Sequence, residues 1–170
     1  MDLGLEGKKV LISAGHKGVG AYIAQRFLQE GASVAICCRR QDDLDQALKE
    51  YNAIGTAVGT LCDFSDSDAV IGWVKDSARS LGGVDICIGN ASASGQHGEG
   101  PDPWNRSFDI DILGNAMFYE TAKPYLVEST AAAIVQIATI TAIEHHGVPI
   151  SPSYGATKAA AIRMISQLAQ

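Results

Sequence analysis

The stretch KKVLISAGHKGVG, residues 8–20, is the strongest indication of the fold class, because an apolar run passes through a glycine-rich turn directly into a helical pattern. The turn contains Gly15, Gly18 and Gly20, and apolar residues then recur at helical spacing until Gly31 supplies a stop. Glycines at these places let the backbone approach a phosphate, whose negative charge the helix N-terminus attracts. We therefore expect a dinucleotide-binding turn; the alternative is a plain tight turn with close helix–strand packing.

The alternation of apolar runs and helical patterns continues along the chain. Strands are predicted over 8–15, 33–38, 55–64, 84–91 and 132–139. The second helix is expected to begin with Asp42 or Asp43 as its cap, and SDSD, residues 65–68, resembles a capping box that opens a third helix. Alternating strands and helices imply right-handed crossovers and a parallel sheet covered on both faces. The prediction is an α/β, three-layer, doubly wound Rossmann fold, with residues 1–170 as a single NAD(P)-binding domain.

Composition excludes several classes of protein. The chain has 170 residues, a formal charge of −6 and a pI of about 5.1, without a basic run, so nucleic acid and anionic membranes are not expected as partners. It has no apolar run long enough to span a bilayer and no signal segment, which favours a cytoplasmic location. The four Cys lack the spacing of a zinc site, so we expect buried free thiols and no metal.

Basic residues at the end of the second strand indicate which dinucleotide fits. Arg39 and Arg40 follow Cys38 there, and Lys17 lies in the glycine turn. An acidic residue would suit a ribose 2′-hydroxyl and basic residues a 2′-phosphate, so NADP(H) is predicted over NAD(H). Asp63, at the end of the third strand, is a candidate acceptor for the adenine amino group, or else a turn or capping residue.

The segment SPSYGATKAAAIRMIS, residues 151–166, places Tyr154 four residues before Lys158 in a helical pattern. One helical turn brings the two side chains onto the same face. A positive charge beside a phenol favours phenolate, which makes a Tyr a usable proton donor or acceptor near neutral pH. The alternative is an accidental pair on a solvated helix face.

Taken together, the glycine turn and the motifs CDFSD, IGNAS, IVQIAT and YGATK resemble the short-chain dehydrogenase/reductase family over essentially the whole chain. The resemblance implies hydride transfer between NADP(H) and a small carbonyl or alcohol substrate. Tyr154 would be the general acid/base, assisted by Lys158, which would also hydrogen-bond the nicotinamide ribose. The implied cofactor-binding residues are Ser13, Gly15, Lys17, Gly18, Val19, Gly20, Arg39, Arg40, Asp63, Phe64, Asn90, Ala91, Tyr154 and Lys158.

Two catalytic positions depart from the family pattern. The substrate-orienting Ser is replaced by Thr139 when read forward from the fifth strand, or by Thr141 when counted back from Tyr154. Thr139 is preferred on strand alignment, with Ile140 pointing the other way because a strand alternates faces. The relay Asn aligns with Asp111, whose negative charge would oppose a phenolate nearby; Asn115, one turn on, is the fallback.

Candidate substrate contacts are Ser92, Thr141, His97 and His145, the two His lying with His146 in loops near the cofactor face. A rival interpretation is a nucleotide-binding or interaction protein that kept the fold and lost the reaction, favoured by Asp111 and the missing Ser. The family normally continues with two more strands and a substrate-covering segment, and without them the fifth strand is a sheet edge. We therefore expect a C-terminally truncated fragment; the alternative is a partner chain that covers this edge. The helices carrying Asp111 and Tyr154 form the interfaces of the family's dimers and tetramers, which predicts a homodimer or homotetramer.

Overall fold

The computed structural model describes residues 3–93, 100–144 and 151–168. Its strands are β1 (Lys9–Ile12), β2 (Ser33–Cys38), β3 (Ala57–Leu61), β4 (Ile86–Gly89) and β5 (Ala133–Gln136). Its α-helices are α1 (Gly18–Gln29), α2 (Gln41–Tyr51), α3 (Ser67–Leu81), α4 (Asp102–Phe108), α5 (Asn115–Val127) and α6 (Pro152–Leu168). A π-helical turn, η1 (Asp109–Gly114), joins α4 to α5, and a 3₁₀ turn, η2 (Ile140–Ala142), follows β5.

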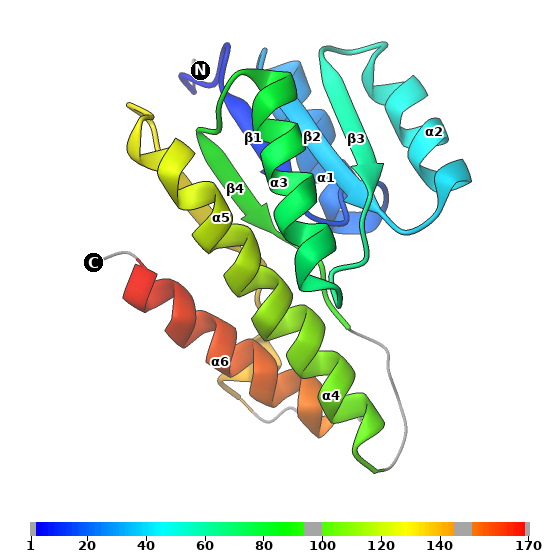
Figure 1. Ribbon diagram of the computed structural model, residues 1–170, viewed down its shortest axis with the longest axis vertical. Coiled ribbons are helices and arrows are strands. Elements are labelled where there is room, and N and C mark those ends of the chain that lie inside the picture. The colour runs from blue at the N-terminus through cyan, green and yellow to red at the C-terminus, as the bar shows by residue number, and fades with distance from the viewer. Residues whose placement is uncertain (1–2, 94–99, 145–150, 169–170) are drawn as a thin grey trace.

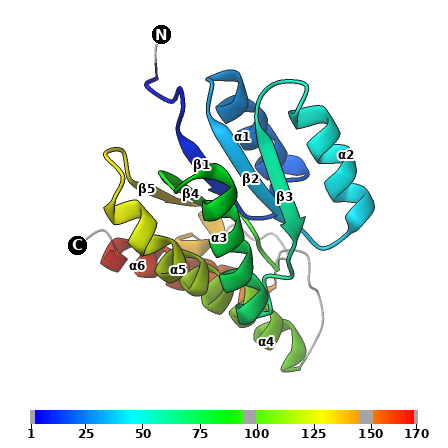
Figure 2. The same ribbon diagram turned by 45° about the horizontal axis from the view of Figure 1, so that its top comes forward.

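The strands form one parallel sheet in the order β3-β2-β1-β4-β5 (Figure 2; Figure 1 shows the same chain with β1 to β4 labelled). Val10 of β1 pairs with Val34 on one side and with Ile86 on the other. Because the strands are parallel, their carboxyl ends meet at the same edge, where the glycine turn and the residues after β4 and β5 lie. The predicted doubly wound Rossmann fold is confirmed.

Alternate residues of each central strand enter separate cores on the two faces of the sheet. Leu11 packs in the core shared with α3 and α5, whereas Val10 and Ile12 pack with α1 and α2. Figures 1 and 2 show α3, α5 and α6 on one side and α1 and α2 on the other. All four Cys are free and buried, as predicted.

The two predicted helix caps are wrong in detail. Helix α2 begins at Gln41 after Arg40, so Asp42 and Asp43 lie in its first turn, where carboxylates still favour the positive end of the helix dipole. Helix α3 is capped by Asp66, whose carboxylate accepts from the backbone N–H groups of Asp68 and Ala69. Asp66 belongs to the SDSD segment, so the prediction that residues 65–68 open the third helix is confirmed.

The fifth strand is a sheet edge, as expected, but it is shorter than predicted and only partly covered. It ends at Gln136, and the chain then enters η2, so the strand alternation expected through Ile140 does not extend that far. Val135 is 45% exposed. None of the helices among the described residues is long and apolar enough to cross a membrane.

The apolar residues on the helices of the expected interface divide between the chain's own core and the surface. Ile110 and Phe118 are buried in the chain's own core, and Met164 and Ile165 pack against it. Leu113 and Ile162 stay exposed, and Trp104 and Phe108 of α4 add further exposed apolar surface.

Candidate active site

The glycine turn is tightly packed at two of its three glycines. A Cβ on Gly15 would lie 2.6 Å from Cγ2 of Ile36, and one on Gly20 would lie 2.6 Å from both the Ala14 carbonyl oxygen and Nδ2 of Asn90. Gly18 has a φ of +57°. The hydroxyl of buried Tyr51 donates to the Gly15 carbonyl at 2.7 Å, and burial raises the pKa of Tyr51 to about 12. The turn therefore has no room for a side chain at Gly15 or Gly20, and the Tyr51 hydroxyl fixes the Gly15 carbonyl.

Ser13 and Asn90 tie the glycine turn to the end of β4. The Ser13 hydroxyl accepts from the backbone N–H groups of Asn90 and Ala91, both at 2.9 Å, and is fully buried. The Asn90 amide donates to the carbonyls of Ser13 and Ala14 at 3.1 and 3.2 Å. The Ser13 side chain therefore supports the turn from inside, which corrects its place among the expected cofactor contacts.

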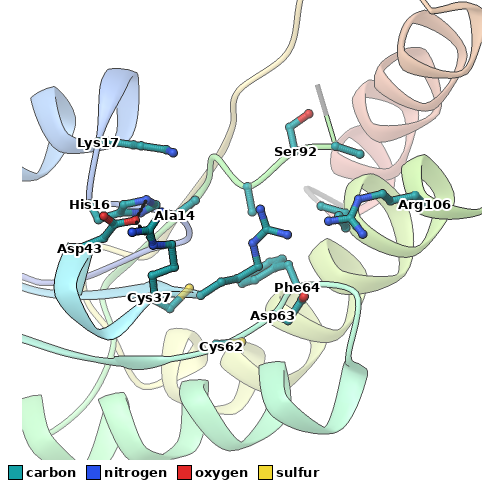
Figure 3. A pocket seen from close by; sticks show the side chains of 15 residues that line it. Ala14, His16, Lys17, Cys37, Asp43, Cys62, Asp63, Phe64, Ser92 and Arg106 are labelled. Atoms are coloured by element: carbon teal, nitrogen blue, oxygen red, sulfur yellow. Dashed lines mark ion pairs between the residues drawn. The ribbon is translucent and has the colours of Figure 1, made fainter. Parts of the chain in front are cut away.

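A pocket of about 210 Å³ opens beside this turn (Figure 3). It brings together six of the fourteen residues predicted to bind the cofactor, with Ser92 beside them: Lys17, Arg39, Arg40, Asp63, Phe64 and Ala91. Val19 is 59% exposed at the start of α1 and does not line the pocket. Since Tyr154 does not line it either, Ser92 lies with the expected cofactor residues rather than with the Tyr–Lys pair.

Cationic side chains outnumber anionic ones in the pocket. The Asp63 carboxylate accepts from the backbone and hydroxyl of Ser65; although burial acts to raise it, these hydrogen bonds, with Arg39 and Arg106 nearby, lower the pKa of Asp63. Asp63 thus serves as both a turn residue and a pocket residue. Lys17, Arg39, Arg40 and Arg106 face two carboxylates, Asp63 and Asp43, the latter 3.7 Å from Arg40. The surplus positive charge suits an anionic ligand.

Sequence reasoning missed several residues that line the pocket, among them His16, Asp43, Arg106 and Ile110. His16 lies inside the quoted glycine turn, and its Nε2 is 3.9 Å from Asp43. Burial and the neighbouring Lys17 ammonium lower the pKa of His16, and the opposing effect of Asp43 does not overcome them. Arg106 comes from α4, on the other side of the pocket from His16 (Figure 3), and no sequence signal relates it to the turn.

Tyr154 and Lys158 lie together on α6, as their spacing predicted. The Lys158 ammonium is 5.9 Å from the centre of the Tyr154 ring. Lys158 is 1% exposed, and its ammonium donates to the carbonyl of Ile137, just beyond β5, at 3.1 Å. Tyr154 is only partly buried, so the phenol is more accessible than the ammonium that accompanies it.

The two candidates for the substrate-orienting hydroxyl, Thr139 and Thr141, lie next to each other. Thr139 and Thr141 flank Ile140 in η2, and their hydroxyl oxygens are 3.1 Å apart. A Cβ on Gly155, the residue after Tyr154, would lie 3.1 Å from the Thr141 carbonyl oxygen, so this turn packs against the start of α6. The strand alignment did not predict this 3₁₀ turn. Because the turn brings the two hydroxyls together, either Thr is placed to take the predicted role.

Asp111 is fully buried in η1 and faces Lys158. Its Oδ1 is 3.3 Å from the Lys158 ammonium, and its Oδ2 accepts from the Thr157 hydroxyl at 3.3 Å. The negative charge expected to oppose the phenolate is therefore paired with the neighbouring cation. Asn115, the fallback residue, donates to the carbonyls of Ile110 and Asp111, both at 3.2 Å, and so supports the π-helical turn instead.

His97 and His145 lie outside the described residues, as does His146. Among the described residues, no cluster of three or more His, Cys, Asp or Glu side chains could hold a metal ion.

A parallel sheet with a glycine turn, a cationic pocket and a Tyr–Lys pair at one edge defines a Rossmann-type protein built to hold a nucleotide. The model of the short chain dehydrogenase family matches residues 8–170. The chain belongs to this family.

Relatives with known names or structures agree with this assignment. The chain is 36% identical to isoepoxydon dehydrogenase patN of Penicillium expansum, over 99% of this chain and 66% of that protein. It superposes with a TM-score of 0.92 and 25% identity on L-sorbose reductase from Gluconobacter frateurii, complexed with NADPH and L-sorbose, covering 99% of this chain and 65% of that one. A 3-oxoacyl-acyl-carrier-protein reductase from Brucella melitensis with bound NAD gives a TM-score of 0.84 and 28% identity, covering 94% and 63%. The chain thus spans about two thirds of the length of these relatives.

Proposed function

We propose that the protein is an NADP(H)-dependent oxidoreductase that interconverts a small carbonyl compound and its alcohol, with Tyr154 as general acid/base. The observation that carries the proposal is the Tyr154–Lys158 pair on α6, a helix that packs at Gly155 against the η2 turn carrying the Thr139 and Thr141 hydroxyls. Membership of the short chain dehydrogenase family supports the same reaction class.

The residues present fit a nicotinamide dinucleotide. Gly18, the first residue of α1, is exposed and has nothing within 4 Å of the place a Cβ would take, so a pyrophosphate can approach the backbone at the N-terminus of the helix. Lys17, Arg39 and Arg40 would hold the 2′-phosphate, and Asp63 and Ala91 would contact the adenosine. Lys158 would hydrogen-bond the nicotinamide ribose, as the family resemblance implies.

The chain's own residues supply proton transfer and orientation. When bound, the nicotinamide supplies or takes up the hydride. In reduction, Tyr154 donates its phenolic proton to the substrate oxygen, and in oxidation it removes the hydroxyl proton. A Thr139 or Thr141 hydroxyl donates a hydrogen bond to the same oxygen and fixes its position. The Lys158 ammonium, close to the Tyr154 ring, stabilises the phenolate that remains.

NADP(H) is proposed over NAD(H) because of the surplus positive charge beside the turn. Lys17, Arg39, Arg40 and Arg106 outnumber the two carboxylates of the pocket, Asp43 and Asp63. A 2′-phosphate satisfies such a site better than a 2′-hydroxyl does. L-sorbose reductase, complexed with NADPH, supports this preference; the NAD-bound Brucella enzyme shows that the fold accepts either cofactor.

The test is Tyr154→Phe in the full-length protein, with NADPH consumption followed against aldehydes, ketones and quinones. We expect turnover to be abolished while calorimetric binding of NADPH stays within about threefold, because the phenol moves a proton and contributes little to affinity. Tyr125→Phe makes the same change on α5, outside the pocket and the Tyr–Lys site, and should leave both readouts unchanged. Unimpaired reduction by Tyr154→Phe would refute the assignment.

A second function, a nucleotide-binding protein without turnover, is favoured by Asp111 at the relay position. NADPH binding by the full-length parent without consumption on any substrate of the panel would support it. In either case the free, buried Cys suit a reducing compartment, and we propose a cytoplasmic location.

A further inference from the structure

Three elements meet around the Lys158 ammonium. Helix α6 carries Lys158, the segment after β5 offers the Ile137 carbonyl at 3.1 Å, and η1 offers the Asp111 carboxylate at 3.3 Å. Lys158 is 1% exposed and Asp111 is 0% exposed, so neither charge is solvated. An ion in such surroundings is costly without a counter-ion, and a carbonyl dipole alone does not neutralise an ammonium.

The position of the Asp111 carboxylate is fixed from both sides. Its second oxygen lies 3.3 Å from the hydroxyl of Thr157, the residue before Lys158, and shares the single proton of that hydroxyl with the Ser153 carbonyl at 3.0 Å. The π-helical turn that carries Asp111 is braced by the Asn115 amide, which donates to the Ile110 and Asp111 carbonyls. Single π-helical turns of this kind occur frequently at functional sites, where they redirect a side chain. The turn therefore holds the carboxylate against the ammonium in one geometry.

The contact between Asp111 and Lys158 is an ion pair rather than an aligned hydrogen bond, because Oδ1 of Asp111 has no hydrogen-bond partner among the described residues. An ammonium carries three N–H donors, and one of them is donated to Ile137. The carboxylate thus balances the charge of Lys158 while leaving donors free for a ligand. An amide at position 111 would supply a dipole there but no charge.

We propose that Asp111 is a positioning residue: its carboxylate is the counter-ion of Lys158 and fixes the direction in which the ammonium meets the nicotinamide ribose and Tyr154. The inference rests on the proposed function for the identity of the ribose, whereas the ion pair is a property of the chain alone. It reverses the expectation from the family pattern, because restoring the usual Asn at this position should impair the site rather than repair it.

The pair is tested by a double-mutant cycle on the full-length protein with Asp111→Asn, Lys158→Met and the two combined. Each single change leaves one buried group unpaired and should lower the melting temperature by about 10 °C. The combined change removes both charges, so its melting temperature should lie well above the value expected from adding the two single effects. Asp109→Asn makes the same chemical change within η1, outside the pair, and should leave the melting temperature unchanged.

Ligand binding tests positioning separately from stability. Asp111→Asn should weaken NADPH binding about threefold to tenfold and leave binding of 2′,5′-ADP, which lacks the nicotinamide ribose, unchanged. Where the parent turns over, Asp111→Asn should lower kcat about tenfold to 100-fold, since small displacements of a reacting group have effects of this size. In the Lys158→Met background, Asp111→Asn should have no further effect on kcat.

Several outcomes would overturn the inference while leaving the proposed function intact. Additive melting temperatures would show that the two groups are not coupled. An unchanged or higher kcat for Asp111→Asn would show that Asp111 does not position Lys158. If neither Asp111→Asn nor the double variant folded, Asp111 would be a packing residue and nothing more. A parent that binds NADPH without turnover would refute the reaction alone, because the melting temperatures and the two binding constants still decide the role of Asp111.

Discussion

Single side chains at the pocket set the cofactor preference that we propose. Arg39→Asp places a negative charge where a 2′-phosphate would lie, so NADPH affinity should fall at least tenfold, the size expected for a lost charge-assisted hydrogen bond. NADH affinity should change little, and the preference should vanish or invert. Calorimetric titration of both cofactors measures the effect, and in the parent the preference should weaken as salt screens the exposed charges.

The matched control for this change is Arg79→Asp. Arg79 is an exposed residue of α3 and forms an ion pair with Asp76. Its replacement by Asp reverses a charge in the same way as Arg39→Asp does, but outside the pocket. It should leave both affinities unchanged. Equal affinity of the parent for NADPH and NADH would contradict the preference itself.

Among the elements, the glycine turn and helix α3 respond in opposite ways to an added methyl group. Gly20→Ala would force the Ala14 carbonyl or the Asn90 amide to move, at a cost of about 1–3 kcal/mol, and should weaken NADPH binding. Gly72→Ala, within α3, adds a Cβ with nothing within 4 Å and should stabilise the protein by about 1 kcal/mol. Urea unfolding measures both free energies. A neutral Gly20→Ala variant would show that the turn yields easily.

The elements that hold the site differ in how far the sequence predicts them. The strands were predictable because their apolar runs are continuous, and so was the Tyr154–Lys158 pair, because i and i+4 must share a helix face. The π-helical turn at Asp111 was not predictable, because its residues carry an ordinary helical pattern and the irregularity arises from packing against α6. Arg106 was missed for a similar reason, since only the fold brings α4 to the pocket.

At the scale of the whole molecule, Asp85 links the start of β1 to the segment after α5. This link should make the stability of the protein sensitive to acid. Its carboxylate accepts from the Lys9 backbone N–H at 2.8 Å and from the Ser129 hydroxyl. Burial acts to raise the pKa of Asp85, but these hydrogen bonds hold it below the ordinary 3.8. A depressed folded-state pKa means that this stabilisation is present above that ordinary value and is lost as the pH falls through the folded-state value.

Asp85→Asn should therefore lower the free energy of unfolding by roughly 1 kcal/mol at neutral pH. The free energy of unfolding of this variant should also fall less than that of the parent as the pH is lowered from about 5 to about 3. Chemical unfolding across that range provides the measurement. Asp76→Asn, in an exposed pair with Arg79, should keep the parent's acid dependence. An Asp85→Asn variant with that same dependence would show that the acid sensitivity arises elsewhere.

The assembly of the molecule is predicted to be a homodimer or homotetramer. Leu113, Ile162, Trp104 and Phe108 leave apolar surface on the helices of the expected interface. Light scattering at micromolar concentration should report an oligomer, and Phe108→Glu with Ile162→Glu should shift it toward monomer. Ile54→Glu, at an exposed site after α2, is the control. A monodisperse parent monomer would contradict the prediction.

The strand order separates the residues proposed to distinguish the two cofactors from the residues proposed to move the proton. Arg39, Arg40 and Asp43 follow β2 on one flank of the sheet, Tyr154 and Lys158 come after β5 on the other, and β1 and β4 lie between them. The two tasks can therefore be altered independently. Exchanging the short β2–α2 connection should re-engineer the protein for the other cofactor while its chemistry is retained, and natural divergence along this lineage can follow the same route.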